Sequence, residues 1–109
     1  MTTVRVTKRF ERIISVECEG HSGYAEYGED IVCAGISSIV QTALLGLMQV
    51  AGVAVDYEAD SDRGYLRMTL PEDISPLQDN ASQIILSTMM LGIMDLHEGY
   101  SDFIELEVI

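Results

Sequence analysis

The chain has 109 residues, of which 48% are hydrophobic and 22% charged, so it can bury one core but is too short for two ordinary domains. Its net charge is −12, from 6 basic and 18 acidic residues. Nucleic acids and anionic membrane surfaces are bound through basic patches, so this charge argues against both as main partners. We expect one domain over residues 1–109 whose charged partner, if it has one, is basic.

The cysteine content and the first residues indicate a reducing compartment. Cys18 and Cys33 are the only cysteines, too few for a disulfide scaffold, and residues 1–12 contain no apolar segment of the kind found in signal peptides. We therefore expect a cytoplasmic protein with both thiols free. The uncharged stretch 31–55 is long enough to cross a bilayer, but it contains polar residues and is flanked by carboxylates. A buried helix that continues into a strand explains it better.

Two segments at the start of the chain alternate between apolar and polar side chains. In residues 3–10 the apolar face includes Phe10, and in residues 12–19 it includes Cys18. Alternation on both sides of a short polar break predicts a β-hairpin. The next residues, 20–30, have the sequence GHSGYAEYGED and no periodicity, which predicts a loop that is long for so small a domain.

A helix over residues 31–51 is predicted from apolar residues that recur at helical spacing. Asp30 is placed to cap the start of this helix, and Gly52 is placed to end it. Alternation then predicts strands at 53–59 and 65–70, which are separated by the turn sequence ADSDRG.

A second helix is predicted from about Ser75 to Leu96, entered through a Ser-Pro pair, and a last strand at 102–109. The order ββαββαβ indicates an α+β fold, a two-layer domain in which two helices pack on one mixed or antiparallel sheet. From Ile84 onward the second helix is apolar on nearly all sides, so all its sides must be covered. We expect a homodimer through this helix; the alternative is a helix that lies wholly inside the domain.

Cys33 is the residue best placed for chemistry. In the predicted helix it lies in the first turn, where unpaired backbone N–H groups and the helix dipole stabilise a thiolate. The same amides are suited to bind an oxyanion. The alternative is an ordinary buried helix cysteine. Cys18, on the apolar face of its strand, is interpreted as a core thiol of that kind.

His21 favours a catalytic role for Cys33. It stands in the predicted loop, where no periodicity assigns it to a core, and the loop is long enough to bring the imidazole back to the helix. A cysteine with a histidine in hydrogen-bond reach is the minimum for nucleophilic catalysis with a general base. Ser37, one turn after Cys33, is placed to donate to a thiolate or an oxyanion, although a packing role explains its position as well. Asp30 is placed to orient His21 as well as to cap the helix.

No metal ion or other cofactor is expected. The cysteines and histidines show none of the close spacings that metal ligands need, and the sequence has no glycine-rich phosphate-binding motif. His97 falls near the end of the second predicted helix, where an imidazole meets the negative end of the helix dipole. We interpret His97 as structural.

Residues 20–37, GHSGYAEYGEDIVCAGIS, resemble the signature of the Prp family, the bacterial ribosomal-processing cysteine proteases. The shared features are a Gly-His pair, a Gly-Tyr-Ala segment, and Gly-x-Asp-Ile-Val-Cys with a serine one turn later. The order of strands and helices is similar over nearly the whole chain. Ser22 and Gly35 stand where relatives often have alanine, and neither position carries the chemistry.

This resemblance implies roles for individual residues. It makes Cys33 the nucleophile and His21 the base, with Asp30 and Ser37 as accompanying positions and Gly20 as a glycine that lets the loop move. Members of such a family remove a short N-terminal extension from a large-subunit ribosomal protein, so that the protein can enter the ribosome. They are generally homodimers in which this loop is a mobile lid. Ribosomal proteins are strongly basic, which suits a net charge of −12.

The hypothesis is therefore a cytoplasmic cysteine endopeptidase that acts on a basic ribosomal protein. Two other classes stay open. One is a non-catalytic acidic dimer that binds or chaperones a basic ribosomal protein. The other is a thiol redox protein that uses Cys33, for which no resolving cysteine lies nearby in the sequence.

Overall fold

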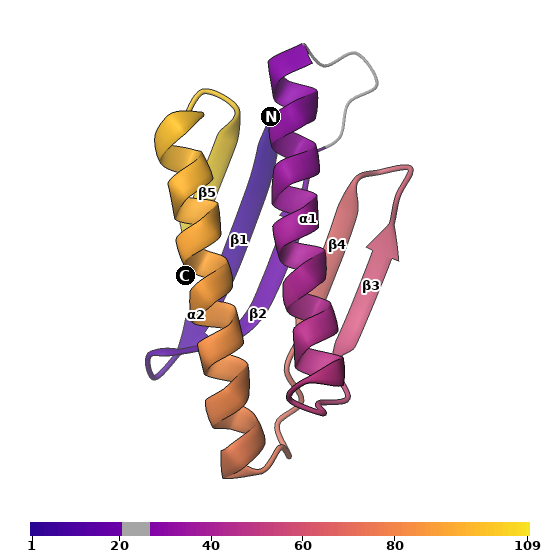
Figure 1. Cartoon of the computed structure of the whole chain (residues 1–109), viewed down its shortest axis with the longest axis vertical. Helices are drawn as coiled ribbons and strands as arrows, with labels where there is room; N and C mark the ends of the chain where they lie inside the picture. The colour runs from indigo at the N-terminus through magenta and orange to yellow at the C-terminus, as the bar shows by residue number, and fades with distance from the viewer. Residues whose placement is uncertain (21–26) are drawn as a thin grey trace.

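The computed structural model describes the backbone of residues 1–20 and 27–109, and the side chains of residues 1–20 and 31–109. The predicted order ββαββαβ is confirmed (Figure 1). The elements are β1 (Thr2–Arg9), β2 (Arg12–Glu19), α1 (Tyr27–Gln49), β3 (Asp56–Asp60), β4 (Tyr65–Thr69), α2 (Pro76–Gly99) and β5 (Ile104–Val108).

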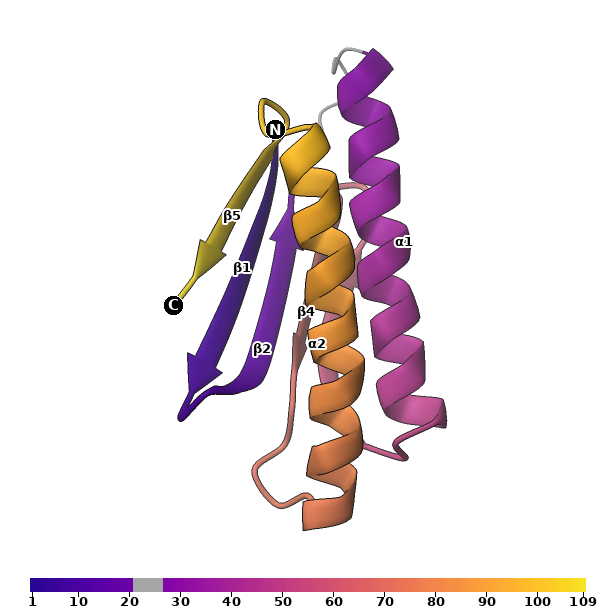
Figure 2. The ribbon, with the colours of Figure 1, turned by 60° about the vertical axis from the view of Figure 1, so that its left-hand side comes forward.

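The strands form one mixed sheet in the order β3-β4-β2-β1-β5. β5 pairs with β1 in parallel, and the other neighbouring strands are antiparallel. The strands β4 and β5 therefore point the same way, and α2 makes the crossover that such a connection requires. Both helices cover the same face of the sheet, as Figures 1 and 2 show, so the two-layer α+β architecture is confirmed.

The hairpin of β1 and β2 closes through a two-residue turn. Phe10 and Glu11 form this turn with φ angles of 53° and 67°, the left-handed conformations that match the twist of the flanking strands. Phe10, expected on the apolar face of the first strand, is instead 92% exposed at the turn. Cys18 pairs opposite Val4 and is buried, as expected.

Helix α1 begins earlier than the sequence pattern predicts. It starts at Tyr27 rather than at residue 31, so Asp30 lies inside the helix and the expectation that it caps the helix is wrong. Residues 27–30 contain no apolar side chain in phase with the rest of the helix. Acidic residues are nevertheless favoured in a first turn, next to the positive end of the dipole. Cys33 consequently lies in the second turn of α1 and not in the first.

The core lies between the sheet and the two helices. From the sheet it contains Val4, Val6, Val16 and Met68, and from the helices Val32, Ile36, Val40, Leu47, Leu86, Met89 and Ile93. Within the described residues, one helical stretch, Ile31–Gln49, is long and apolar enough to cross a membrane by length and composition. Its buried side chains belong to this core, as the sequence analysis expects of a buried helix.

The helices pack closely because glycines face the partner helix. A Cβ added at Gly35 would lie 3.3 Å from Leu96 Cδ1, and one added at Gly92 would lie 3.4 Å from Ile39 Cδ1. A methyl group at Gly35 would require the Leu96 side chain to shift by a few tenths of an ångström, whereas one at Gly92 would be at the limit of ordinary contact with Ile39. The small residues thus let α1, which carries Cys33, pack closely against α2.

Helix α2 begins as its sequence predicts. Ser75 is the N-cap, with its hydroxyl accepting from the Gln78 amide and the Gln78 side chain accepting from the Ser75 amide. The Gln78 side-chain amide also donates to the Gly52 carbonyl at 2.9 Å. Helix α1 ends at Gln49, two residues before the predicted end, and Gly52 follows three residues later with a φ of 68°, a conformation typical of glycine after a helix. His97 lies in the last turn of α2, as predicted.

The second helix is not wholly internal. Leu77, Ile84, Leu91 and Met94 are between 51% and 81% exposed, and they lie on the side of α2 that neither the sheet nor α1 covers. The alternative of a fully buried helix is therefore wrong for the single chain.

An ion pair between β2 and α2 makes the stability depend on pH. Arg12 Nε donates to Asp79 Oδ2 at 2.9 Å, and its Nη2 donates to the other carboxylate oxygen. Hydrogen bonding to Arg12 lowers the pKa of Asp79. A carboxyl whose pKa is lower in the folded state stabilises the fold above its unfolded pKa, and this contribution is lost as the pH falls through the folded value.

We expect Asp79→Asn to lower the free energy of unfolding at pH 7 by about 1 kcal/mol, and the difference from wild type to shrink below about pH 4. Urea denaturation at several pH values measures this. Asp95→Asn, an exposed carboxyl on the same helix, is the matched control. A difference that stays constant down to pH 3 would contradict the assignment.

Candidate active site

A groove lies between α1 and the β3–β4 hairpin, with a volume of about 760 Å³. The Cys33 thiol lies in one wall of the groove. The described residues of the α1 wall are Cys33, Ala34, Ser37, Val40, Gln41, Leu44, Leu45 and Met48; Cys18, Tyr57, Ala59, Asp60, Ser61, Gly64, Tyr65 and Leu66 complete the lining from the sheet.

The Cys33 side chain is partly exposed and touches the end of β2. Its Sγ lies 3.6 Å from the Gly20 carbonyl oxygen, to which the thiol donates. His21 is the residue that follows Gly20. His21 itself lies outside the described residues, and so does the side chain of Asp30. The described chain thus brings the thiol to the residue next to the predicted base.

The longer α1 changes the expected chemistry of Cys33. The dipole effect falls off within the first turn of a helix, and the free N–H groups belong to the first four residues. Cys33 lies beyond them, so the expectation that helix-start amides adjoin the thiol is wrong.

Cys18 is the inert thiol that its place in the strand predicts. It is 6% exposed, and burial, followed by the neighbouring Cys33, raises the pKa of its thiol to about 12. A thiol of that pKa carries almost no thiolate at neutral pH, and the thiolate is the nucleophile. The two free cysteines of the chain therefore differ in burial, and only Cys33 is open to a reagent.

Ser37 lies one turn after Cys33, as its spacing predicts, and lines the same groove. Its hydroxyl oxygen accepts a hydrogen bond of 2.7 Å from the Gln41 side-chain amide. This hydrogen bond uses one lone pair of the Ser37 oxygen, so the Ser37 hydroxyl proton is free to be donated to another acceptor. Gln41 was not identified from the sequence, although its position four residues after Ser37 placed it on the same helix face.

Gly20 is needed for a close approach of two backbone segments. Its φ is 139°, and an added Cβ would lie 2.2 Å from the Met1 carbonyl oxygen and 2.6 Å from Thr2 Cα. The Thr2 hydroxyl donates to the Gly20 carbonyl at 3.5 Å. No side chain fits at this position. Gly20 therefore has a positional role in the described structure, in addition to the loop motion that the family resemblance implies.

A small polar cluster joins the β3–β4 turn to the end of β2. Arg63 donates to Glu19 at 3.1 Å, and its guanidinium lies 4.7 Å from the centre of the Tyr65 ring. The Tyr65 hydroxyl donates to Glu17 at 3.2 Å. These residues carry no local sequence signal, because Arg63 and Tyr65 are more than 40 positions away from the glutamates that they contact. The cluster holds the groove wall against the residue that precedes Gly20.

No group of three or more His, Cys, Asp and Glu side chains among the described residues is arranged to hold a metal ion. The ionisable side chains in the described lining of the groove are two thiols, two tyrosines and Asp60. Asp60 accepts from the backbone amides of Asp62 and Arg63, which makes it part of the turn. What the groove presents to a ligand is therefore mostly apolar surface and one accessible thiol.

An accessible thiol in an open groove, on a two-layer α+β domain, is the arrangement that a small thiol-dependent enzyme needs. Comparison with known proteins gives the class more closely. The family model described as Cysteine protease Prp matches residues 1–105. The chain therefore belongs to the Prp family and is a cysteine protease.

Relatives of known activity cover most of the chain. The ribosomal processing cysteine protease Prp of Staphylococcus aureus is 30% identical over 107 residues, 97% of each protein. That of Bacillus subtilis is 30% identical over 90 residues, which is 83% of this chain and 80% of the relative. A crystal structure of the S. aureus enzyme with a substrate peptide superposes with a TM-score of 0.89 at 26% identity, covering 100% of both chains.

Family membership decides between the classes that the sequence left open. The chain is an enzyme, so neither a purely non-catalytic acidic dimer nor a thiol redox protein describes it. The recognition of the family from residues 20–37 is confirmed.

The difference in burial between the two cysteines predicts selective alkylation. Iodoacetamide at pH 8 should modify Cys33 of the folded protein and leave Cys18 unmodified, because a buried thiol with a pKa of about 12 is neither ionised nor reachable. Peptide mass spectrometry measures both sites. In urea both thiols should react, which is the control. Equal labelling of Cys18 in the folded protein would contradict this account of the site.

Proposed function

We propose that this protein is a cytoplasmic endopeptidase that removes the N-terminal extension of a large-subunit ribosomal protein and so serves ribosome assembly. Cys33 is the nucleophile and His21 the general base. The observation that carries the proposal is the contact between the Cys33 sulfur and Gly20, the residue before His21, at 3.6 Å in an open groove. The S. aureus relative, a ribosomal processing protease, has been crystallised with a substrate peptide, which supports a peptide substrate for this chain.

The reaction begins with transfer of the thiol proton from Cys33 to His21. The sulfur then bonds to the carbonyl carbon of the scissile peptide, and the carbonyl electron pair moves to the oxygen. When the tetrahedral species collapses, the carbon–nitrogen bond breaks and the imidazolium gives its proton to the departing amine. Water, deprotonated by His21, hydrolyses the thioester and restores the Cys33 thiol.

Ser37 and Asp30 support this chemistry. Gln41 occupies the acceptor side of the Ser37 hydroxyl, so that the hydroxyl proton is available to the oxyanion in the groove. Asp30 precedes Cys33 by three positions in α1, which is slightly less than one turn along the helix backbone. We assign Asp30 the role of orienting His21, a role that the loss of its capping function leaves intact.

The charge of the chain supports a basic substrate. Of the 6 basic residues, Arg5, Arg12, Arg63 and Arg67 each pair with a carboxylate of the same chain. These pairs neutralise the basic residues locally and leave the acidic surplus to dominate the surface. A field of this sign attracts a ribosomal protein over a distance and raises the rate of encounter. The two free cysteines are compatible with a cytoplasmic location.

Replacement of Cys33 tests the proposal. Cys33→Ala should lower cleavage of the ribosomal precursor by at least about 10³-fold, because no other described residue can take the place of the nucleophile. Cys18→Ala is the matched control and should keep activity close to that of wild type. Mass spectrometry of the precursor, before and after incubation, measures the reaction and maps the bond that is cut. Cleavage by Cys33→Ala at the wild-type rate would refute the mechanism.

The homodimer is part of the proposal. Leu77, Ile84 and Leu91 recur every seven residues along α2 and are 81%, 60% and 69% exposed, with Met94 at 51%. A stripe of this kind lies on one side of a helix and suits packing against the same stripe of a second copy. We propose that the two copies meet through this face of α2.

A charged residue in this stripe should separate the two copies. Leu91→Glu is expected to sediment as a monomer where the wild type sediments as a dimer, since the substitution places two carboxylates in an apolar interface. Val108→Glu, on the exposed part of β5, makes the same change of charge elsewhere and should remain dimeric. Sedimentation velocity distinguishes them. A wild-type protein that is monomeric at high micromolar concentration would exclude the dimer.

A further inference from the structure

The groove continues far beyond the thiol. Cys33 lies near one end of the α1 wall and Met48 at the other, which is about 22 Å along a helix that rises about 1.5 Å per residue. An extended peptide advances about 3.3 Å per residue. The groove can therefore hold about six residues of substrate on one side of the scissile bond.

The two ends of the groove differ in chemistry. Figure 1 shows that β3 begins beside the C-terminal end of α1 and runs back toward its N-terminal half. The end near Cys33 is polar, with Ser37, Gln41, Asp60 and Ser61 in its lining. The far end is apolar. Its lining comes from Leu44, Leu45, Met48 and Tyr57.

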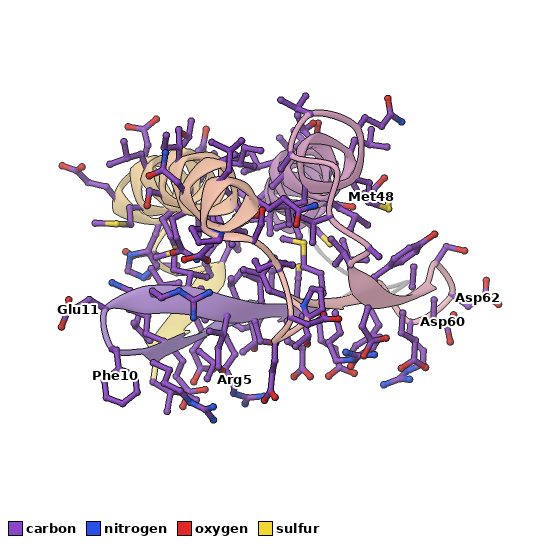
Figure 3. All side chains as sticks on the ribbon, turned by 90° about the horizontal axis from the view of Figure 1, so that it is seen from below. Arg5, Phe10, Glu11, Met48, Asp60 and Asp62 are labelled. Atoms are coloured by element: carbon purple, nitrogen blue, oxygen red, sulfur yellow. The ribbon has the colours of Figure 1, made fainter. Side chains whose placement is uncertain are left out.

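The far end leaves large apolar side chains open to water. Leu45 on α1 is 51% exposed and Tyr57 on β3 is 50% exposed, although both line the same groove. Met48 extends from the side of α1 that faces the β3–β4 hairpin (Figure 3). An apolar side chain that enters between these residues removes its own surface and theirs from water, which is the main source of affinity in such sites.

The charge next to this end indicates what enters it. Asp56 and Glu58, the neighbours of Tyr57, lie on the edge strand of the sheet and are exposed; Arg67 of β4 pairs with Asp56, so the edge keeps a net negative charge from Glu58. In the proposed dimer the second copy occupies the exposed face of α2, and two copies of this acidic edge would repel each other. A segment of a basic protein would be attracted to it. The occupant that fits both the apolar lining and the acidic edge is the substrate itself.

We propose that Leu45, Met48 and Tyr57 form a specificity site for a bulky apolar side chain of the substrate, five to seven residues from the scissile bond. This inference rests on the proposed function, because it takes Cys33 as the point of cleavage. The site selects among substrates through binding, at a distance from the chemistry. It adds a second point of recognition to the contacts near the thiol.

The test uses fluorogenic peptides built on the bond that mass spectrometry maps in the precursor, with eight residues on each side. Alanine is placed in turn at every apolar position of the long peptide. For the wild type, one replacement five to seven residues from the bond should lower kcat/KM about tenfold, mostly through KM. The variants Tyr57→Ala and Leu45→Ala should cleave the unmodified peptide with the same tenfold loss in kcat/KM relative to wild type. Alanine at the sensitive peptide position should lower kcat/KM no further in these variants.

Short peptides separate recognition from folding. Peptides with three residues on each side of the bond do not reach the far end, so wild type and Tyr57→Ala should cleave them equally. Phe10→Ala, which removes an exposed aromatic ring outside the groove, is the matched control and should resemble wild type with both peptides. Fluorescence anisotropy measures binding without cleavage. The labelled long peptide should bind the Cys33→Ala variant more tightly than the double variant Cys33→Ala, Tyr57→Ala.

Three results would overturn the inference while leaving the proposed function standing. These are equal loss of short- and long-peptide cleavage in Tyr57→Ala, no loss with either peptide, or an absence of any sensitive position five to seven residues from the bond. By contrast, cleavage of the precursor by Cys33→Ala would refute the proposed function itself. The two failures are therefore distinguishable.

Discussion

The active-site region depends on the close approach of the end of β2 to the start of β1. Gly20 lies so near the Met1 carbonyl and Thr2 that no Cβ fits there. This approach holds the Gly20 carbonyl between the Thr2 hydroxyl and the Cys33 thiol. The chain therefore leaves the sheet at a fixed point beside the thiol. The described backbone thus places Cys33 beside the residue that precedes His21 in the sequence.

Much of the fold follows from local pattern. Alternation located the strands, and Ser75 located the start of α2 because its cap and the following proline are local signals. The start of α1 was missed, since Tyr-Gly-Glu-Asp at 27–30 carries no apolar residue in helical phase. Because α1 begins one turn earlier than predicted, Cys33 lies in the second turn and not at the helix terminus. Its supposed activation by the dipole depended on the boundary, which is the least certain feature of a sequence-based helix.

The groove could not be predicted in the same way, because its walls come from segments far apart in the chain. Tyr57 looked like one more apolar residue of an alternating strand, and Leu45 like part of a buried helix. Both stay half exposed because β3 is an edge strand that α1 flanks without covering. The cluster of Glu19, Arg63 and Tyr65 has the same origin. Cys33 and Ser37, in contrast, are one turn apart, so helical spacing alone placed them together.

The edge strand β3 carries charged side chains on one face and an apolar side chain on the other. Glu58 pairs in register with Arg67, which donates to Asp56, so these charges occupy the face of the strand opposite to Tyr57. Tyr57 faces the groove. The acidic charges that we propose attract a basic protein and the apolar surface that we propose holds its extended segment thus lie on opposite faces of one strand. Attraction over a distance therefore does not require a buried charge in the groove, where the cost of desolvation would weaken binding.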